Sequence, residues 1–382
     1  MGATLANWRQ APWSSWAFHH VPQLIPVAKI ARDPGRIAPL PAKAGGLDGF
    51  SFQGPDGTRW DMARFLTASS TDGLLVMRDG AAVFEWYGNG FTAEAKHIIF
   101  SVSKSITGTV AGALVAQGSL DPDAPVTRYV PEAAGSVYGD CAVRHVLDMT
   151  VGLAFVEDYL DTTGDFARYR LATGWNPSSE PGSVADLHKF LTTLKRDANP
   201  HGAKYHYASP NSDMLGWILE RAAGKPYPAM VSDLLWQPTG AEHDAEVTTD
   251  GVGAARAAGG ICVALRDLAR FGELMRNGGQ VAGRQVIPAA WIEDIRSNGD
   301  FAPWRASDAV KFLPRGRYRS QWYIIGNDHG AYCGIGIHGQ WVYVDPKARV
   351  VIAKQSSQPL PIEEATDRLV LAAFDAIGHH LA

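Results

Sequence analysis

The stretch FSVSKSITGTVAGALVAQG, residues 100–118, decides how the rest of the chain is interpreted. Its ITGTVAGALVAQG part contains no charged residue, which predicts a helix buried on all sides. Ser101 and Lys104 stand three residues apart at its start, so they share one helical face. A serine beside an amine at a helix N-terminus can be an activated nucleophile, whereas a capped helix with a surface lysine is the structural alternative. A lysine heading a buried helix is costly without a function, which favours the nucleophile.

Strand patterns lie on both sides of this helix, early and late in the chain. Residues 73–88, GLLVMRDGAAVFEWYG, predict a hairpin that turns at Asp79-Gly80. Three late strands are predicted by SQWYIIGN, CGIGIHGQWVYVD and ARVVIAKQSS, which short turns connect in an antiparallel order. Further helices are predicted over 264–279 and 363–381.

Residues between these two strand regions have mostly helical patterns, except for 155–175, which is expected to be loop-like and aromatic. The prediction is therefore an α/β fold of the α+β type, with an antiparallel sheet flanked by helices. One domain is expected to combine 1–118 with 250–382. A mostly helical domain, 119–249, is expected to be inserted between them.

Composition narrows the function classes. The formal net charge of −4 argues against a nucleic-acid partner, and no apolar run is long enough for a membrane span. Cys141, Cys262 and Cys333 are few and far apart, which favours free thiols. Together with an N-terminus that lacks a secretory signal pattern, they predict a cytoplasmic location. The histidines form no H-E-x-x-H motif, so neither a metal nor a cofactor is expected; the sequence leaves a homodimer open.

Two further stretches carry polar groups suited to chemistry. KYHYASPNSDMLGWILE, residues 204–220, places Tyr207 and Ser209 at the start of an amphipathic helix; an aromatic residue beside a helix cap is the structural alternative. CGIGIHGQWVYV matches G-x-G-x-x-G at Gly334, Gly336 and Gly339, but a strand follows it where a dinucleotide site requires a helix. Glycines within a strand instead allow a ligand or another backbone to come close.

These three stretches, in this order, resemble the serine β-lactamase and penicillin-binding superfamily. Within it, the chain resembles the 6-aminohexanoate-dimer (nylon oligomer) hydrolases and their esterase relatives. The resemblance extends nearly end to end and includes WAFHH near the start, SVSKS at 101–105, EDY at 157–159 and GIGIHGQ. It implies a β-lactamase/transpeptidase-like fold and a serine hydrolase that works through an acyl-enzyme on carboxylic esters and small linear amides.

The resemblance also implies residue roles. Ser101 would be the nucleophile, Lys104 would hold its hydroxyl and favour the alkoxide, and Tyr207 would carry the proton. A phenol can act as a base near neutral pH only if a nearby ammonium lowers its pKa, so Tyr207 is expected to have a lowered pKa. Ser209 would support Lys104.

Further positions are implied around these groups. The backbone N–H groups of Ser101 and Ile337 would form the oxyanion hole. Tyr159 would face the leaving group, or would be an ordinary packed tyrosine. Gly336 would border the substrate on the edge strand.

Two departures from the family pattern put the substrate in question. Typical β-lactamases and penicillin-binding proteins have Lys-Thr-Gly on the edge strand, where this chain has Gly334-Ile335-Gly336. Nylon-dimer hydrolases place a carboxylate on the 155–175 segment to attract the substrate's ammonium; the nearest equivalent here is Arg170, with Asp161 and Asp165 close by in the sequence. The alternatives are a β-lactamase or penicillin-binding type of acyl-serine enzyme, and a non-catalytic scaffold on the same fold.

Overall fold

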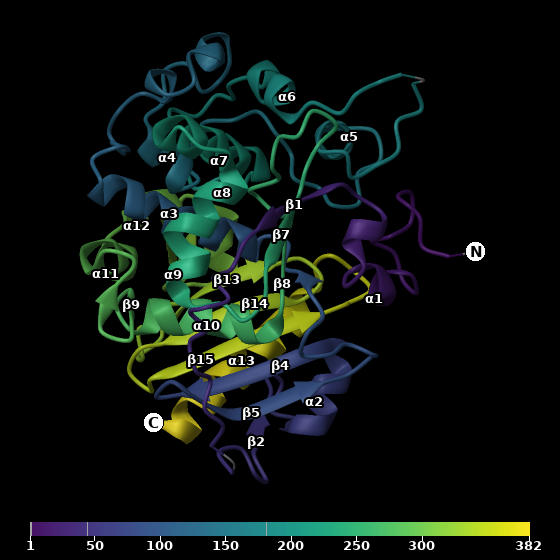
Figure 1. Ribbon diagram of the computed structural model, residues 1–382, viewed down its shortest axis with the longest axis vertical. Helices are drawn as coiled ribbons and strands as arrows, with labels where there is room; N and C mark the ends of the chain where they lie inside the picture. Colours follow the sequence, from purple (N-terminus) through teal and green to yellow (C-terminus); the bar gives the residue numbers. More distant parts are fainter. Residues whose placement is uncertain (1, 44, 181) are drawn as a thin grey trace.

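A seven-stranded antiparallel sheet forms the base of the molecule in the computed structural model, which describes residues 2–43, 45–180 and 182–382. Its strand order is β11-β12-β13-β14-β15-β4-β5, so the early hairpin pairs with the last strand of the chain (Figure 1). The strands are β4 (Thr71–Arg78), β5 (Ala81–Tyr87), β11 (Arg317–Arg319), β12 (Trp322–Ile324), β13 (Tyr332–Gly336), β14 (Gln340–Asp345) and β15 (Val350–Ser356). The predicted hairpin, the late strands and the antiparallel pairing are confirmed.

Alternate residues of the central strands face two different hydrophobic layers. Leu75 and Met77 of β4 belong to the cluster that contains α10 (Leu265–Arg276). Leu74 and Val76, which point the other way, belong to the cluster that contains α13 (Glu364–Leu381). The sheet is therefore covered by helices on both faces, which explains the nearly continuous apolar sequence of its strands.

The helix of the opening stretch is α3, Val102–Ala116, and its residues 102–114 are all buried. It packs between the sheet and helix α7 (Ser209–Ala223), which in turn contacts α4 (Val143–Leu147); α4 and α7 lie in the half of the molecule away from β5 (Figure 1). Gly108 allows this close packing, because a Cβ at that position would lie 2.2 Å from the carbonyl oxygen of Ser320. The prediction of a helix buried on all sides is confirmed.

The other helices are short and surround this framework. They are α1 (Ser14–Ala17), α2 (Met62–Ala68), α5 (Asp165–Ala172), α6 (Leu187–Thr193), α8 (Tyr227–Val231), α9 (Gln237–Thr239), α11 (Ala289–Ser297) and α12 (Phe301–Arg305). Helix α5 falls inside the 155–175 segment that was expected to be loop-like, so that part of the interpretation is wrong for residues 165–172.

A second, small sheet was not expected from the sequence. It has four antiparallel strands in the order β1-β7-β8-β6, namely β1 (Val27–Ile30), β7 (Ala245–Thr248), β8 (Ile261–Val263) and β6 (His97–Ile98). Two hairpin pairs complete the strands: β2 (Ser51–Gln53) with β3 (Arg59–Asp61), and β9 (Gln280–Val281) with β10 (Arg284–Gln285). The division into a domain of both chain ends and an inserted helical domain stays a prediction.

Candidate active site

Ser101 occupies the N-cap position of α3 but does not cap it, because its side chain makes no bond to the first turn. Instead, Lys104 Nζ lies 2.8 Å from Ser101 Oγ. The preceding residue, Phe100, has a φ of 41°, a left-handed conformation that is uncommon for a bulky residue. The chain therefore turns sharply into the helix at the point where the serine is presented.

Lys104 is almost fully buried, and its amine lies between three oxygen atoms. Besides Ser101, these are Ser209 Oγ at 3.0 Å and the carbonyl oxygen of Ala258 at 2.8 Å. Burial lowers the pKa of Lys104 to about 7, although the nearby Glu157 acts in the opposite direction. An amine with this pKa can exist without its extra proton near neutral pH, so it can accept the proton of Ser101.

Tyr207 lies directly beside this pair. Lys104 Nζ is 5.0 Å from the centre of the Tyr207 ring, and Ser101 and Tyr159 both act to lower the pKa of the phenol. Burial raises the pKa of Tyr207 well above its ordinary value, which contradicts the expectation of a lowered pKa. The physical reason is that burial penalises a phenolate, and that the neighbouring Tyr323 and Glu157 oppose it further. A phenol with a raised pKa is suited to donate a proton rather than to accept one, and of the two groups Lys104 has the pKa that suits a base.

Glu157 was not singled out from the sequence, yet its carboxylate joins three groups of the site. It accepts hydrogen bonds from the Ser209 backbone N–H, from Ser209 Oγ at 2.5 Å and from the Tyr159 hydroxyl at 2.8 Å. Because Ser209 begins helix α7, the carboxylate also lies at the positive end of that helix. The only signal in the sequence was its position in the EDY motif, two residues before Tyr159.

Asp213 supports the site from behind. Its Oδ1 accepts the backbone N–H of Ala258 at 2.7 Å, and its Oδ2 pairs with Arg256 and with the Tyr169 hydroxyl. Since the carbonyl of Ala258 accepts a bond from Lys104, this buried ion pair fixes one of the three acceptors of the lysine. Asp213 belongs to no motif in the sequence, so this role could not be predicted from the sequence.

The end of β13 lies against the start of α3. A Cβ on Gly336 would be 2.6 Å from the carbonyl oxygen of Ile99 and 3.1 Å from the backbone nitrogen of Ser101. The glycine therefore lets the strand that leads into Ile337 approach the backbone of Ser101. Residues 334–339 comprise the end of β13 and the turn into β14, so a strand follows them, which agrees with the rejection of a dinucleotide site.

Two predicted substrate-binding residues are engaged within the protein. The hydroxyl of Tyr159 donates to Glu157, and its ring packs edge-on against Phe166 at 4.9 Å. Arg170 donates to the carbonyl oxygens of Tyr159, at 3.2 Å, and of Asp161. Arg170 thus holds the loop that carries Glu157 and Tyr159.

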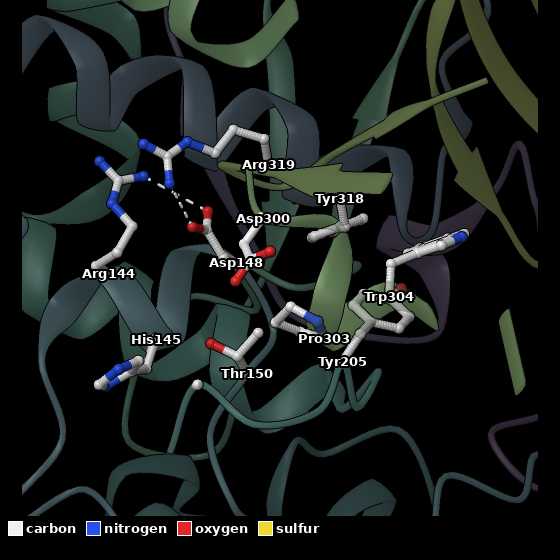
Figure 2. Close-up of a pocket in the computed structure, with 11 residues that line it drawn as sticks. Arg144, His145, Asp148, Thr150, Tyr205, Asp300, Pro303, Trp304, Tyr318 and Arg319 are labelled. Carbon is white, nitrogen blue, oxygen red and sulfur yellow. Dashed lines mark hydrogen bonds and ion pairs between the residues drawn. The ribbon is translucent and has the colours of Figure 1, made fainter. Parts of the chain in front are cut away.

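A cavity of about 240 Å³ lies apart from these groups, and its lining includes neither Ser101, Lys104 nor Tyr207. Figure 2 shows Arg144 and Arg319 converging on Asp148 on one side of the cavity and Tyr205, Trp304 and Tyr318 on the other. Within the described residues, no group of His, Cys, Asp and Glu side chains could hold a metal ion.

Comparisons with known proteins show which family the chain belongs to. The family model for Beta-lactamase matches residues 62–376. Over 359 residues the chain is 38% identical to the 6-aminohexanoate-dimer hydrolase of Paenarthrobacter ureafaciens, which covers 94% of this chain and 89% of that protein. A shorter match, 32% identical over 145 residues, covers 37% of the chain and 36% of an esterase from Burkholderia gladioli.

Solved structures share the fold. A Bacillus anthracis protein described as a candidate 6-aminohexanoate-dimer hydrolase superposes with a TM-score of 0.90 at 27% identity, covering 100% of this chain and 98% of that one. A family VIII carboxylesterase reaches a TM-score of 0.62 at 16% identity, covering 82% and 95%, which shows a common fold alone.

Proposed function

The chain belongs to the beta-lactamase family and hydrolyses amide or ester bonds, and from this premise we propose that it attacks its substrate with Ser101 and forms an acyl-enzyme. The observation that carries the proposal is the 2.8 Å contact between Lys104 Nζ and Ser101 Oγ, made by a buried amine whose pKa is lowered to about 7. In this proposal the neutral amine takes the proton of Ser101 as Oγ bonds to the substrate's carbonyl carbon.

The oxyanion of the tetrahedral intermediate is bound by the backbone N–H groups of Ser101 and Ile337. Tyr207 gives its proton to the leaving oxygen or nitrogen and is reprotonated from Lys104, which leaves the acyl group on Ser101. Water then attacks the acyl-enzyme by the reverse series of proton transfers and releases the acid. A phenol that stays protonated suits the donor role, since its pKa is raised by burial.

We assign carboxylic esters and small linear amides as substrates, with oligomers of the 6-aminohexanoate type among the amides. The 38% identity to a hydrolase of that dimer supports the amide part, and the esterase match supports the ester part. β-Lactams are disfavoured, because Gly334-Ile335-Gly336 offers no cationic or hydroxyl anchor on the edge strand.

The nucleophile is tested by trapping the acyl-enzyme. Ser101→Ala should lower kcat by roughly 10⁴-fold or more and abolish labelling by an acyl-serine probe. Ser103→Ala is the matched control, since that residue is fully buried and bonds to the backbone of Ile261. An adduct mapped to Ser103, or near wild-type turnover in Ser101→Ala, would refute the assignment.

The substrate order follows from the leaving groups. Short-chain esters should be cleaved best, linear amides more slowly and β-lactams least, because an alkoxide needs less protonation than an amine to leave. The measurement is kcat/KM for p-nitrophenyl esters, linear 6-aminohexanoate amides and nitrocefin. A linear amide that matches the best ester would contradict the order.

We also propose a cytoplasmic location and a homodimeric assembly. A cytoplasmic location fits the three free, buried cysteines, and a homodimer is the simplest assembly to test by size-exclusion chromatography with light scattering. No described helix is long and apolar enough to cross a membrane.

A further inference from the structure

Two arginines beside the candidate active site have no carboxylate partner. Arg9 donates to the carbonyl oxygen of Trp175 at 3.1 Å and to Asn176 Oδ1 at 2.5 Å. Arg170 donates only to the backbone carbonyls of Tyr159 and Asp161. Within the part of the chain that the structure describes, neither guanidinium forms an ion pair. Both positive charges are thus held by neutral acceptors.

The two guanidinium groups are also close enough to repel one another. Burial lowers the pKa of Arg9, and the charges of Arg170 and Arg256 lower it further. Arg256 is neutralised by its contact with Asp213, whereas Arg9 has no such contact. Since arginine keeps its charge in proteins, this arrangement costs free energy unless an anion compensates it.

Carboxylates of the neighbouring loop compensate Arg170 only from a distance. Asp161 directs Oδ1 to the backbone N–H groups of Thr163 and Gly164, at 2.9 and 2.7 Å, and Asp158 is exposed. They raise the pKa of Arg170, but burial outweighs them and the net shift is downward.

Aromatic contacts fix Arg9 and connect it to the nucleophile. Its guanidinium stacks over Trp8 at 4.9 Å and lies 5.9 Å from the Trp175 ring. Both tryptophan rings contact Phe100, the residue before Ser101, at centroid distances of 6.1 and 6.0 Å. Arg9 is therefore held by two tryptophan rings, and both of these rings contact the residue that precedes Ser101.

Arg170 is connected to the site from the other direction. It holds the backbone of Tyr159, whose hydroxyl bonds to Glu157, and Glu157 in turn bonds to Ser209. Arg9 is thus linked to Phe100 through its aromatic neighbours, and Arg170 is linked to Ser209 through Tyr159 and Glu157.

We propose that Arg9 and Arg170 form a subsite for a carboxylate carried by the substrate, away from the bond that is cleaved. The inference rests on the proposed function and names its substrate class: esters and amides with a free carboxylate at one end. Arg9 binds it through the fork of N–H donors that matches a carboxylate, and Arg170 adds charge. A terminal ammonium would meet repulsion at the same place.

The test compares substrates that differ only at the far end. One series of p-nitrophenyl esters has an acyl chain ending in a carboxylate, a carboxamide or a trimethylammonium group; a second series of esters bears the same three groups on the alcohol. In one of the two series, kcat/KM should be about tenfold or more higher for the carboxylate than for the carboxamide, as for one hydrogen bond to a charged group. The trimethylammonium ester should be the poorest of that series.

Variants assign the preference to Arg9. Arg9→Gln should reduce the carboxylate-to-carboxamide ratio to below about threefold, whereas Arg9→Lys should retain part of it because the charge remains. Added salt should weaken the ratio in the wild type. Arg64→Gln is the matched control: Arg64 also stacks on a tryptophan, Trp60 at 4.0 Å, and donates to a carbonyl, but it lies on α2, away from α1 and α5 (Figure 1).

A wild-type ratio near one in both series would overturn the subsite, as would an unchanged ratio in Arg9→Gln. These outcomes differ from a failure of the proposed function, because the carboxamide esters would still be hydrolysed in a manner that depends on Ser101. A ratio that falls equally in Arg64→Gln would also reject the assignment to Arg9.

Discussion

Three serines stand at positions 101, 103 and 105, and their hydroxyls have different partners. Ser103 Oγ accepts the backbone N–H of Ile261 at 3.2 Å, and Ser105 Oγ donates to the carbonyl of Gln321 at 3.0 Å. Ser101 alone faces Lys104. Ser103 and Ser105 are thus engaged in local structure, and the 3.6-residue period of a helix places Ser101 on the same face as Lys104.

Lys104 makes the activity dependent on pH. Because its pKa is lowered to about 7 by burial, the neutral amine predominates above that pH and the cation below it. We expect kcat/KM for an ester to rise as the pH increases through about 7 and then to level off. A pH–rate profile measures this, and Lys104→Arg should be nearly inactive at every pH. A profile that rises only near the ordinary pKa of lysine would contradict it.

Glu157 should influence how kcat/KM depends on pH. Its negative charge raises the pKa of Lys104, so Glu157→Gln should lower this pKa and move the rising part of the profile to lower pH. The plateau kcat should also fall, because an amide cannot accept the bonds of both the backbone and the hydroxyl of Ser209 through two oxygens.

Asp158→Asn is the control for charge alone, since Asp158 is the exposed neighbour of Glu157. It should leave the midpoint of the profile in place. If the midpoint shifts equally in the two variants, Glu157 acts only as one of several negative charges on the loop.

At the scale of elements, long and strongly patterned segments could be predicted from the sequence, and short ones could not. Helix α3, helix α10 and the 73–88 hairpin carry enough residues to show their period. The strands of the small sheet have two to four residues each, too few for an alternating pattern. The two carboxylates of the site were missed for another reason, since Glu157 and Asp213 are brought to it only by tertiary packing.

The close approach of β13 to the start of α3 gives a prediction at the scale of elements. Gly336→Ala would place a Cβ 2.6 Å from the carbonyl of Ile99, so the strand end must move away from the backbone of Ser101. We expect kcat to fall by about 10²-fold or more, as when an oxyanion-hole donor is lost, while the circular dichroism spectrum stays native. Gly135→Ala is the control, because no atom lies within 4 Å of its Cβ position. Activity within threefold of wild type, with a native spectrum, would contradict the close approach.

At the scale of the whole molecule, the protein buries two lysines without a contacting carboxylate among the residues described. Lys104 lies in the candidate active site, whereas Lys354, on β15, is fully buried beside β14, the neighbouring strand of the sheet. Its amine donates to the carbonyl oxygens of Ser69 at 3.2 Å and Gly339 at 3.3 Å, and to Ser356 Oγ. Burial lowers the pKa of Lys354 to about 7. The fold therefore holds two amines that lose their protons far below the ordinary pKa of lysine.

These two lysines should make the free energy of unfolding rise with pH above about 7. Between that pH and the ordinary pKa of 10.5, the unfolded chain binds a proton that the folded protein does not, so each lysine contributes up to about 1.4 kcal/mol per pH unit. Lys354→Met removes one contribution and should make the slope of stability between about pH 7.5 and 9 shallower by that amount. Urea unfolding at several pH values measures the slope, with Lys347→Met, at an exposed position beside β15, as the control. If Lys354→Met keeps the wild-type slope, the Lys354 amine remains charged in the folded protein, and its three oxygen acceptors compensate the cation without any carboxylate.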